Sequence, residues 1–354
     1  MNQPYSPLTP QPPKKKSSKR TMWTLIGVFG GLFLLFILLI SFATCALIIS
    51  DDDPLSGFSH DYVGVLSING AITSTPEAAS LLSAGGTYSQ SYVLEAIKVM
   101  KEDDDNKGIL LLINSPGGEM YAVDEVYLAL MDYKEKTGRP IYTYCEEYCA
   151  SGGYYLAVAS DVIYANPMST VGSIGVTYGT HIDISGLCEK YGIKLTDIAS
   201  DDNKSMGSYT APLSADQMAI YQGMIDEYYD HFLNVVDAGR ETLTKEDLTR
   251  KEVLDTVTNE NGDVEEITLK LADGRVFTAK QAKEHGLIDK IGTLSGAMSE
   301  MRGVIESDEL AFEYFTYIPD DYGYGAMISM SDSELLTLLL SYSEQAGPMV
   351  LYKD

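Results

Sequence analysis

The sequence predicts an α/β fold with mostly parallel strands, because short apolar runs alternate along the chain with segments of helical periodicity. The clearest strand is the continuous apolar run 108–113 (GILLLI), which precedes a Pro-Gly-Gly turn and suits a strand buried on both faces. Segments 91–101 and 119–136 flank this run and carry apolar residues at helical spacing. The other expected strands cover 62–68, 140–144, 162–165 and 171–177, and the other expected helices cover 151–159, 216–238 and 280–285.

Residues 61–300 are expected to form one domain, because no internal repeat divides them. Near its end, an acidic stretch at 256–266 places Asn-Gly between two alternating runs, which predicts an inserted hairpin but indicates no role for it. Residues 301–354 are less regular and are expected to form a C-terminal extension. Three interpretations stay open for its apolar end at 347–352: docking on a neighbouring chain, entry into a cleft as a self-peptide, or fraying.

Residues 22–50 carry no charge and are expected to form a transmembrane helix. Their centre, 25–40, is almost wholly apolar, and about 20 such residues span the hydrocarbon core of a bilayer. Basic residues precede this segment and three aspartates follow it, so the positive-inside rule places a disordered basic tail, 1–21, in the cytoplasm. Everything after a linker at 51–60 is then outside. A cleaved signal peptide is the alternative, but the apolar run is long for one and no small-residue cleavage site follows it.

The charge balance and the cysteines exclude several classes of protein. The first 20 residues hold five of the 25 basic residues and no acid, so the remainder carries 20 basic against 51 acidic residues. Such a surface repels phosphate and argues against nucleic-acid binding. The four cysteines form no CxxC pair or zinc-type cluster, so no metal or other cofactor is expected. Cys145 and Cys149 either pair in an oxidising compartment or fill space as small apolar residues, and the second interpretation is favoured.

Two glycine-bearing stretches are candidates for catalytic chemistry. The loop 114–118 (NSPGG) closes the buried strand, and Ser151 opens a helix directly after another strand. Each has an ordinary explanation, as a turn and as an N-cap serine. In the functional interpretation, Ser151 is a nucleophile at a helix N-terminus. The N–H of Gly152 and one from the 117–118 loop would then stabilise an oxyanion. Tyr154 and Tyr155 are expected to line an apolar groove for hydrophobic peptides.

A serine nucleophile needs a base, and no histidine qualifies. The four histidines lie in no catalytic motif, and there is no Gly-x-Ser-x-Gly sequence. A desolvated lysine serves in some enzymes. The downstream candidates are Lys190, Lys194 and Lys204, of which Lys204 is favoured because it lies in a loop after a strand. The hydroxyl of Ser173 is a candidate to hold the lysine, unless it is only a glycine-flanked serine in a tight strand.

Together these motifs resemble the signal peptide peptidase A family, in its single-domain form with an N-terminal membrane anchor. The similarity covers roughly residues 60–300 and is carried by 114–118 (NSPGG), 150–155 (ASGGYY), 171–176 (VGSIGV) and the stretches ADGRVF, QA and GLID within 272–289. The resemblance implies a crotonase-like (Clp protease-like) α/β fold and a Ser/Lys dyad. It assigns Ser151 as nucleophile, Lys204 as base, Ser173 as the residue that orients the base, and Gly118 and Gly152 as oxyanion donors.

The resemblance also implies homo-oligomeric rings in which the serine and the lysine of one site come from neighbouring subunits. Family members degrade signal-peptide remnants left in the membrane. The sequence departs from the family at Asp201, where a glycine is usual, and at the acidic insertion 256–266. Carboxylates facing the lysine would keep it protonated, so Asp201 and Asp202 are expected to point outward.

The expected function is therefore that of a membrane-anchored serine endopeptidase whose protease domain, 61–300, lies outside the cytoplasm. Broader peptide degradation is one alternative. A non-catalytic, membrane-tethered peptide-binding scaffold is another, although a scaffold has no need of a nucleophile, a base and an oxyanion loop together. A crotonase-type acyl-CoA enzyme is disfavoured because coenzyme A is cytoplasmic.

Overall fold

The computed structural model describes residues 58, 60–75, 88–258, 263–306, 310–318 and 326–330. The expected tail 1–21, transmembrane helix 22–50, most of the linker 51–60 and the apolar end 347–352 lie outside these residues. Among the helices that are described, none combines the length and the apolar character needed to cross a bilayer.

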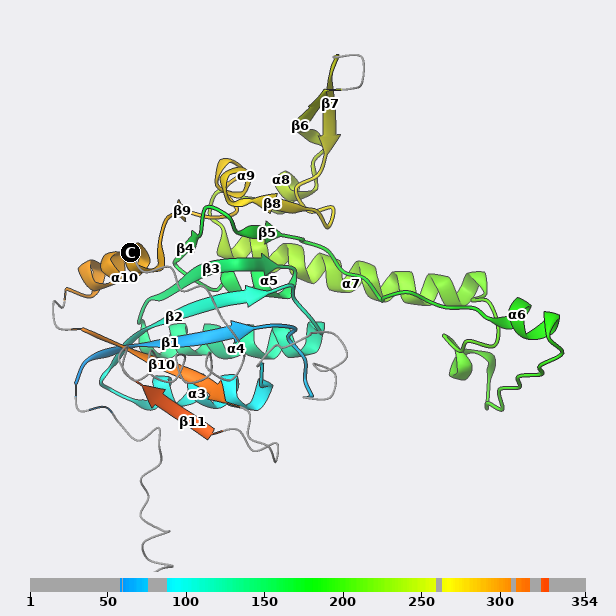
Figure 1. The fold of residues 1–354 in the computed structure, drawn as a ribbon, viewed down its shortest axis with the longest axis horizontal. Coiled ribbons are helices and arrows are strands. Elements are labelled where there is room, and N and C mark those ends of the chain that lie inside the picture. The colour runs from blue at the N-terminus through cyan, green and yellow to red at the C-terminus, as the bar shows by residue number, and fades with distance from the viewer. Residues whose placement is uncertain are drawn as a thin grey trace, which may run out of the picture. The chain divides into compact units, whose positions relative to one another are not determined.

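A mixed sheet of nine strands forms the centre of the described domain, and its order is β11-β10-β1-β2-β3-β4-β9, with β5 joining β3 to β8 (Figure 1). The strands are β1 (Tyr62–Asn69), β2 (Asn106–Ser115), β3 (Ile141–Ala150), β4 (Val162–Ala165), β5 (Thr170–Gly172), β8 (Val276–Thr278), β9 (Lys290–Ile291), β10 (Ala311–Ile318) and β11 (Ala326–Met330). Only the β10–β11 and β5–β8 pairs are antiparallel. The predicted α/β class with mostly parallel strands is confirmed.

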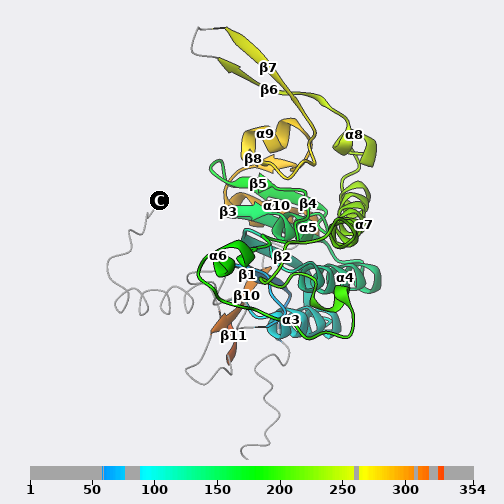
Figure 2. The same ribbon diagram turned by 90° about the vertical axis from the view of Figure 1, so that its right-hand side faces the viewer.

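The described helices are α3 (Gln90–Glu102), α4 (Met120–Thr137), α5 (Gly152–Ala157), α6 (Ser185–Lys190), α7 (Ala215–Gly239), α8 (Lys245–Thr249), α9 (Ala279–Glu284) and α10 (Leu294–Ile305), with a 3₁₀ helix η1 (Asp202–Ser205). Helices α3, α4, α5 and part of α7 cover one face of the sheet, and α10 covers the other (Figures 1 and 2). The acidic insertion forms the expected hairpin from β6 (Glu252–Thr258) and β7 (Val264–Leu269).

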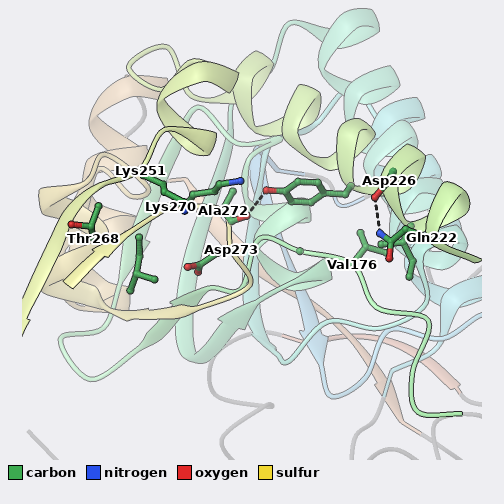
Figure 3. A pocket seen from close by; sticks show the side chains of 12 residues that line it. Val176, Gln222, Asp226, Lys251, Thr268, Lys270, Ala272 and Asp273 are labelled. Carbon is green, nitrogen blue, oxygen red and sulfur yellow. Dashed lines mark hydrogen bonds between the residues drawn. The ribbon is translucent and has the colours of Figure 1, made fainter. Parts of the chain in front are cut away.

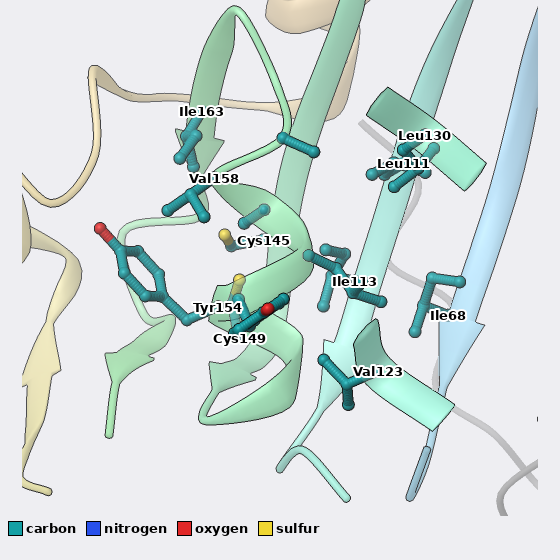
Figure 4. Packing of buried hydrophobic residues seen from close by; sticks show 14 of the residues in the cluster. Ile68, Leu111, Ile113, Val123, Leu130, Cys145, Cys149, Tyr154, Val158 and Ile163 are labelled. Carbon is teal, nitrogen blue, oxygen red and sulfur yellow. The ribbon is translucent and has the colours of Figure 1, made fainter. Parts of the chain in front are cut away.

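The apolar run 108–113 is continuous because each of its two sides enters a different core. Ile109, Leu111 and Ile113 join the cluster under α3, α4 and α5, whereas Leu110 and Leu112 join the cluster under α10. Figure 4 shows Leu111 beside Leu130 in the first of these, with Ile113 and Val123 in the same cluster. Burial of a large aliphatic side chain contributes about 1.5–3 kcal/mol. The two cores hold β2 rigidly, and the strand ends at the glycine loop.

Cys145 and Cys149 lie in the first core as free, fully buried thiols (Figure 4). Burial raises the pKa of the Cys145 thiol, and the neighbouring Cys149 raises it further. Both residues act as small apolar side chains beneath the end of β3, in agreement with the favoured interpretation.

Candidate active site

Ser151 lies at a sharp turn between the end of β3 and the start of α5, and its backbone is in an unusual conformation. Its φ is 53° and its ψ is −121°, in the half of the map that residues other than glycine rarely enter. Such a conformation costs about 1–3 kcal/mol and persists only where the surroundings impose it. Here the N–H donates to the carbonyl of Gly172 (2.7 Å) and the C=O accepts from Tyr155 (2.9 Å). The turn holds the serine at the mouth of a cavity.

The glycine loop after β2 lies directly against this serine. A Cβ added to Gly117 would be 2.6 Å from the N atom of Gly152 and 2.9 Å from the Oγ of Ser151. The loop is fixed from the other side, because the N–H of Ile72 donates to the Gly117 carbonyl (3.0 Å) and the N–H of Glu119 donates to the Ile72 carbonyl (2.8 Å). No sequence signal identified Ile72 as the residue that positions this loop.

Two backbone amides beside Ser151 are left without an acceptor. Within the described ranges, neither the N–H of Gly118 nor that of Gly152 donates to a protein group. The N atom of Gly118 lies 3.3 Å from the place a Cβ on Gly152 would occupy, so the two amides are neighbours. Two adjacent free donors next to a nucleophile are what an oxyanion hole requires.

Ser173 directly follows β5, the strand that pairs with the end of β3 before Ser151. β3 pairs with β5 so that Ala150 faces Gly172, and each strand continues into a serine with a φ near 54°. Ser173 is half-buried, and its N–H donates to the carbonyl of Arg275 (2.6 Å). The fold thus brings four residues into one region: Gly118, Ser151, Gly152 and Ser173. Gly118 and Ser173, the outermost of them in the sequence, are 55 positions apart.

The cavity at Ser151 has a volume of about 220 Å³ and a largely apolar lining. Besides Ser151 and the loop 118–119 it is lined by residues 175–178 and by side chains from α4, α5 and α7: Met120, Val123, Tyr155, Met224, Ile225, Tyr228 and Phe232. Such a lining suits apolar side chains of a ligand.

The two tyrosines after Ser151 have different positions. Tyr155 lines the cavity, and its hydroxyl donates to Asp124 (2.6 Å). Burial, together with this bond, raises the pKa of Tyr155. The expectation that Tyr154 also lines the groove is wrong, because its side chain is fully buried in the core and its hydroxyl donates to the carbonyl of Leu287 (2.8 Å).

Lys204 lies on η1, exposed, and is not among the residues that line the Ser151 cavity. The segment that carries it joins β5 to α7, and Figure 1 shows α6 of this segment beyond the end of α7 that lies away from α5. The side chain of Gln217 on α7 donates to the carbonyl of Asp202 (3.2 Å) and fastens η1 there. The carboxylate of Asp201 accepts a hydrogen bond from the backbone N–H of the next residue, Asp202 (2.7 Å).

A strained serine between a parallel strand and a helix, two free amides and an apolar cavity form an arrangement that can support acyl transfer from a peptide to a serine. The Clp protease family model matches residues 77–171, and the model of peptidase family S49 matches 133–256 and 244–306. The chain belongs to peptidase family S49 and is a serine endopeptidase of the signal-peptide-peptidase type.

Three curated relatives illustrate the similarity. A protein of Enterococcus faecium named as a signal peptide peptidase SppA is 34% identical over 72% of this chain and 67% of its own. A protein of Methanocaldococcus jannaschii named as a protease is 31% identical over 59% of this chain and 60% of its own. Protease 4 of Haemophilus influenzae is 27% identical over 61% of this chain but only 32% of its own length.

Among solved structures, one of the membrane-bound stomatin-specific protease 1510-N is 15% identical to this chain. The match covers 73% of this chain and 99% of the other, with a TM-score of 0.42.

Proposed function

We propose that this chain is anchored in the membrane by residues 22–50 and cleaves signal-peptide remnants and other hydrophobic peptides at the outer face. The observation that carries the proposal is the pair of free amides beside the strained Ser151, at the mouth of an apolar cavity. The name of the Enterococcus faecium relative supports this substrate class. The uncharged run 22–50 and the basic residues before it support the anchor and its orientation.

In the proposed mechanism, Ser151 attacks the peptide carbonyl while Lys204, neutral once a subunit interface has removed it from water, takes the hydroxyl proton. The amides of Gly118 and Gly152 stabilise the oxyanion, and each such donor is typically worth about 10²- to 10³-fold in rate. The protonated Lys204 then gives its proton to the leaving amine, and water hydrolyses the acyl-enzyme. Ser173, next to Ser151 in the sheet, orients the lysine.

A dyad shared between subunits fits the position of Lys204 outside the cavity of its own chain. The segment that carries the lysine exposes many large apolar side chains. A cluster of exposed apolar side chains is typical of a surface that binds another protein. They are Tyr178, Ile182, Leu187, Tyr191, Ile193, Leu195, Ile198 and Tyr209, of which Ile198 is 98% exposed. A neighbouring subunit in a ring would cover this segment and bring its lysine to the next Ser151.

Hydrolysis of a fluorogenic apolar peptide by the full chain and its variants tests the proposal. Ser151→Ala and Lys204→Ala are each expected to lose at least about 10³-fold in kcat. Lys194→Ala is the matched control, because Lys194 is an exposed lysine on the same segment, and it is expected to keep activity. Full activity of either dyad variant would contradict the assignment. A non-catalytic scaffold would bind the peptide but would not react with a serine-directed active-site label.

A further inference from the structure

A second cavity, of about 430 Å³, adjoins the Ser151 cavity and carries two lysines, Lys251 and Lys270 (Figure 3). The two cavities share Gly175, Val176 and Ile225 in their linings, so a ligand in one has direct access to the other. The lysines come from the base of the β6–β7 hairpin, which is the acidic insertion to which the sequence assigned no role. We call this space the two-lysine cavity.

The two lysines are placed unfavourably with respect to each other. Lys251 immediately precedes β6 and Lys270 immediately follows β7, and the first pair of the antiparallel hairpin is Glu252 with Leu269. The lysines are therefore the next opposed pair in this register. Like charges opposite each other across two strands are destabilising. An anion between them would remove that cost.

The described residues supply no ion pair for either lysine. Neither lysine has a carboxylate within ion-pair distance there, although the chain carries 51 acidic residues. Two carboxylates also line the cavity, and each is hydrogen-bonded to a group other than the lysines. Asp273 accepts from Arg275 (2.9 and 3.1 Å), and Asp226 accepts from Gln222 (2.7 Å).

The hydroxyl of Tyr229, which also lines the cavity, donates to the carbonyl of Ala272. The two ammonium groups that line the cavity have no ion pair in the described residues. An ammonium group without an ion-pair partner favours a carboxylate or a similar anion.

We propose that the two-lysine cavity binds a carboxylate of the same peptide that Ser151 attacks, an inference that rests on the proposed function. A peptide in extended form advances about 3.3 Å per residue, so a chain that follows the shared Gly175–Val176 lining reaches the lysines a few residues from the cleaved bond. An acidic side chain supplies a carboxylate only in some sequences. Every peptide released by an earlier cleavage ends in one, so this subsite would favour short fragments, whose C-terminus lies a few residues from the cleaved bond, over long chains cleaved far from their C-terminus.

Binding to the full chain carrying Ser151→Ala tests the proposal without turnover. Three labelled apolar peptides are compared by fluorescence anisotropy. Two have one sequence, with a free C-terminal carboxylate or an amide, and the third is amidated and carries a glutamate near its end. The amidated peptide is expected to bind about three- to tenfold more weakly than the free acid, and the difference should shrink at high salt. Recovery by the glutamate peptide would show that a side-chain carboxylate is also accepted.

The double variant Lys251→Gln/Lys270→Gln, made in the Ser151→Ala chain, is expected to bind the free acid and the amide equally. Lys283→Gln is the control, because Lys283 is an exposed lysine on α9 that has no carboxylate partner in the described part and does not line the cavity. It should keep the discrimination. Equal binding of acid and amide by the Ser151→Ala chain would overturn the inference, as would discrimination that survives removal of both lysines.

Turnover by the chain with Ser151 intact separates this inference from the proposed function. With the free acid as substrate, the double-lysine variant is expected to raise KM and leave kcat unchanged, since the contact is made equally in the ground and transition states. A chain that discriminates acid from amide in binding but hydrolyses neither would contradict the proposed function and leave the carboxylate site standing.

Discussion

Replacing Gly117 by alanine tests the geometry of the oxyanion loop. The backbone of Gly117 has φ +99°, and an added Cβ would be 2.6 Å from the N atom of Gly152 and 2.7 Å from the Cβ of Ser151. Ordinary contacts of a Cβ begin at 3.4 Å, so these groups must separate by about 0.8 Å. A misplacement of about 1 Å in a catalytic group costs roughly 10²-fold in rate. We therefore expect kcat/KM to fall about 10²-fold.

The matched control is Gly138→Ala. Gly138 also has a positive φ, +66°, and ends α4, but an added Cβ there meets nothing within 4 Å. Both substitutions force alanine into a left-handed conformation, at about 1–2 kcal/mol of folding stability. Only the change at Gly117 disturbs Ser151. Peptidase assays and thermal unfolding of both variants make the comparison. If Gly117→Ala keeps kcat/KM within threefold of Gly138→Ala, the loop is not an oxyanion hole.

Two further predictions concern groups under the site. Burial alone would raise the pKa of the Asp289 carboxyl, but bonds from Arg240 and the Ile163 N–H outweigh it and hold the pKa below its usual range. The ionised Asp289 carboxylate therefore stabilises the folded chain above about pH 4, and this contribution is lost as the pH falls through the pKa of Asp289 in the folded state. In chemical unfolding, Asp289→Asn should lower the free energy of unfolding by about 3 kcal/mol at pH 7 and by less near pH 3. The control is Glu95→Gln, which removes an exposed ion pair and should lower the free energy of unfolding by less than about 0.5 kcal/mol. Cys145 and Cys149 should resist maleimide in the native chain and react within minutes once it is unfolded; fast native labelling would contradict their burial.

Most of the sheet was predictable because its strands are buried on both faces. The run 108–113 and the helices on either side follow from apolar spacing alone, and β2, α3 and α4 match them closely. The expected strand 171–177 is shorter, because Gly172 and Ser173 turn into the left-handed region and end β5 at Gly172. β10 was missed, although its sequence AFEYFTYI is rich in residues that favour strands.

The site was predictable only in part, because it depends on pairing between distant segments. Ser151 and the two glycines proposed as oxyanion donors follow from local motifs at strand ends. The placement of Ser151 and Ser173 after a paired Ala150 and Gly172 comes from the β3–β5 register, and the opposition of Lys251 and Lys270 comes from the β6–β7 register. Neither register can be read from the spacing of residues. The proposed pairing of Lys204 with Ser151 depends on assembly, which lies beyond the sequence of one chain.

Mixing two inactive variants tests the central claim most directly. Chains carrying Ser151→Ala and chains carrying Lys204→Ala are combined in equal amounts, dissociated and reassembled, and their peptidase activity is compared with that of the unchanged chain. If each site takes its serine and its lysine from neighbouring subunits, random mixing restores about one quarter of the sites. If both residues of a site came from one chain, every site would lack one of them, and the mixture would stay as inactive as either variant alone.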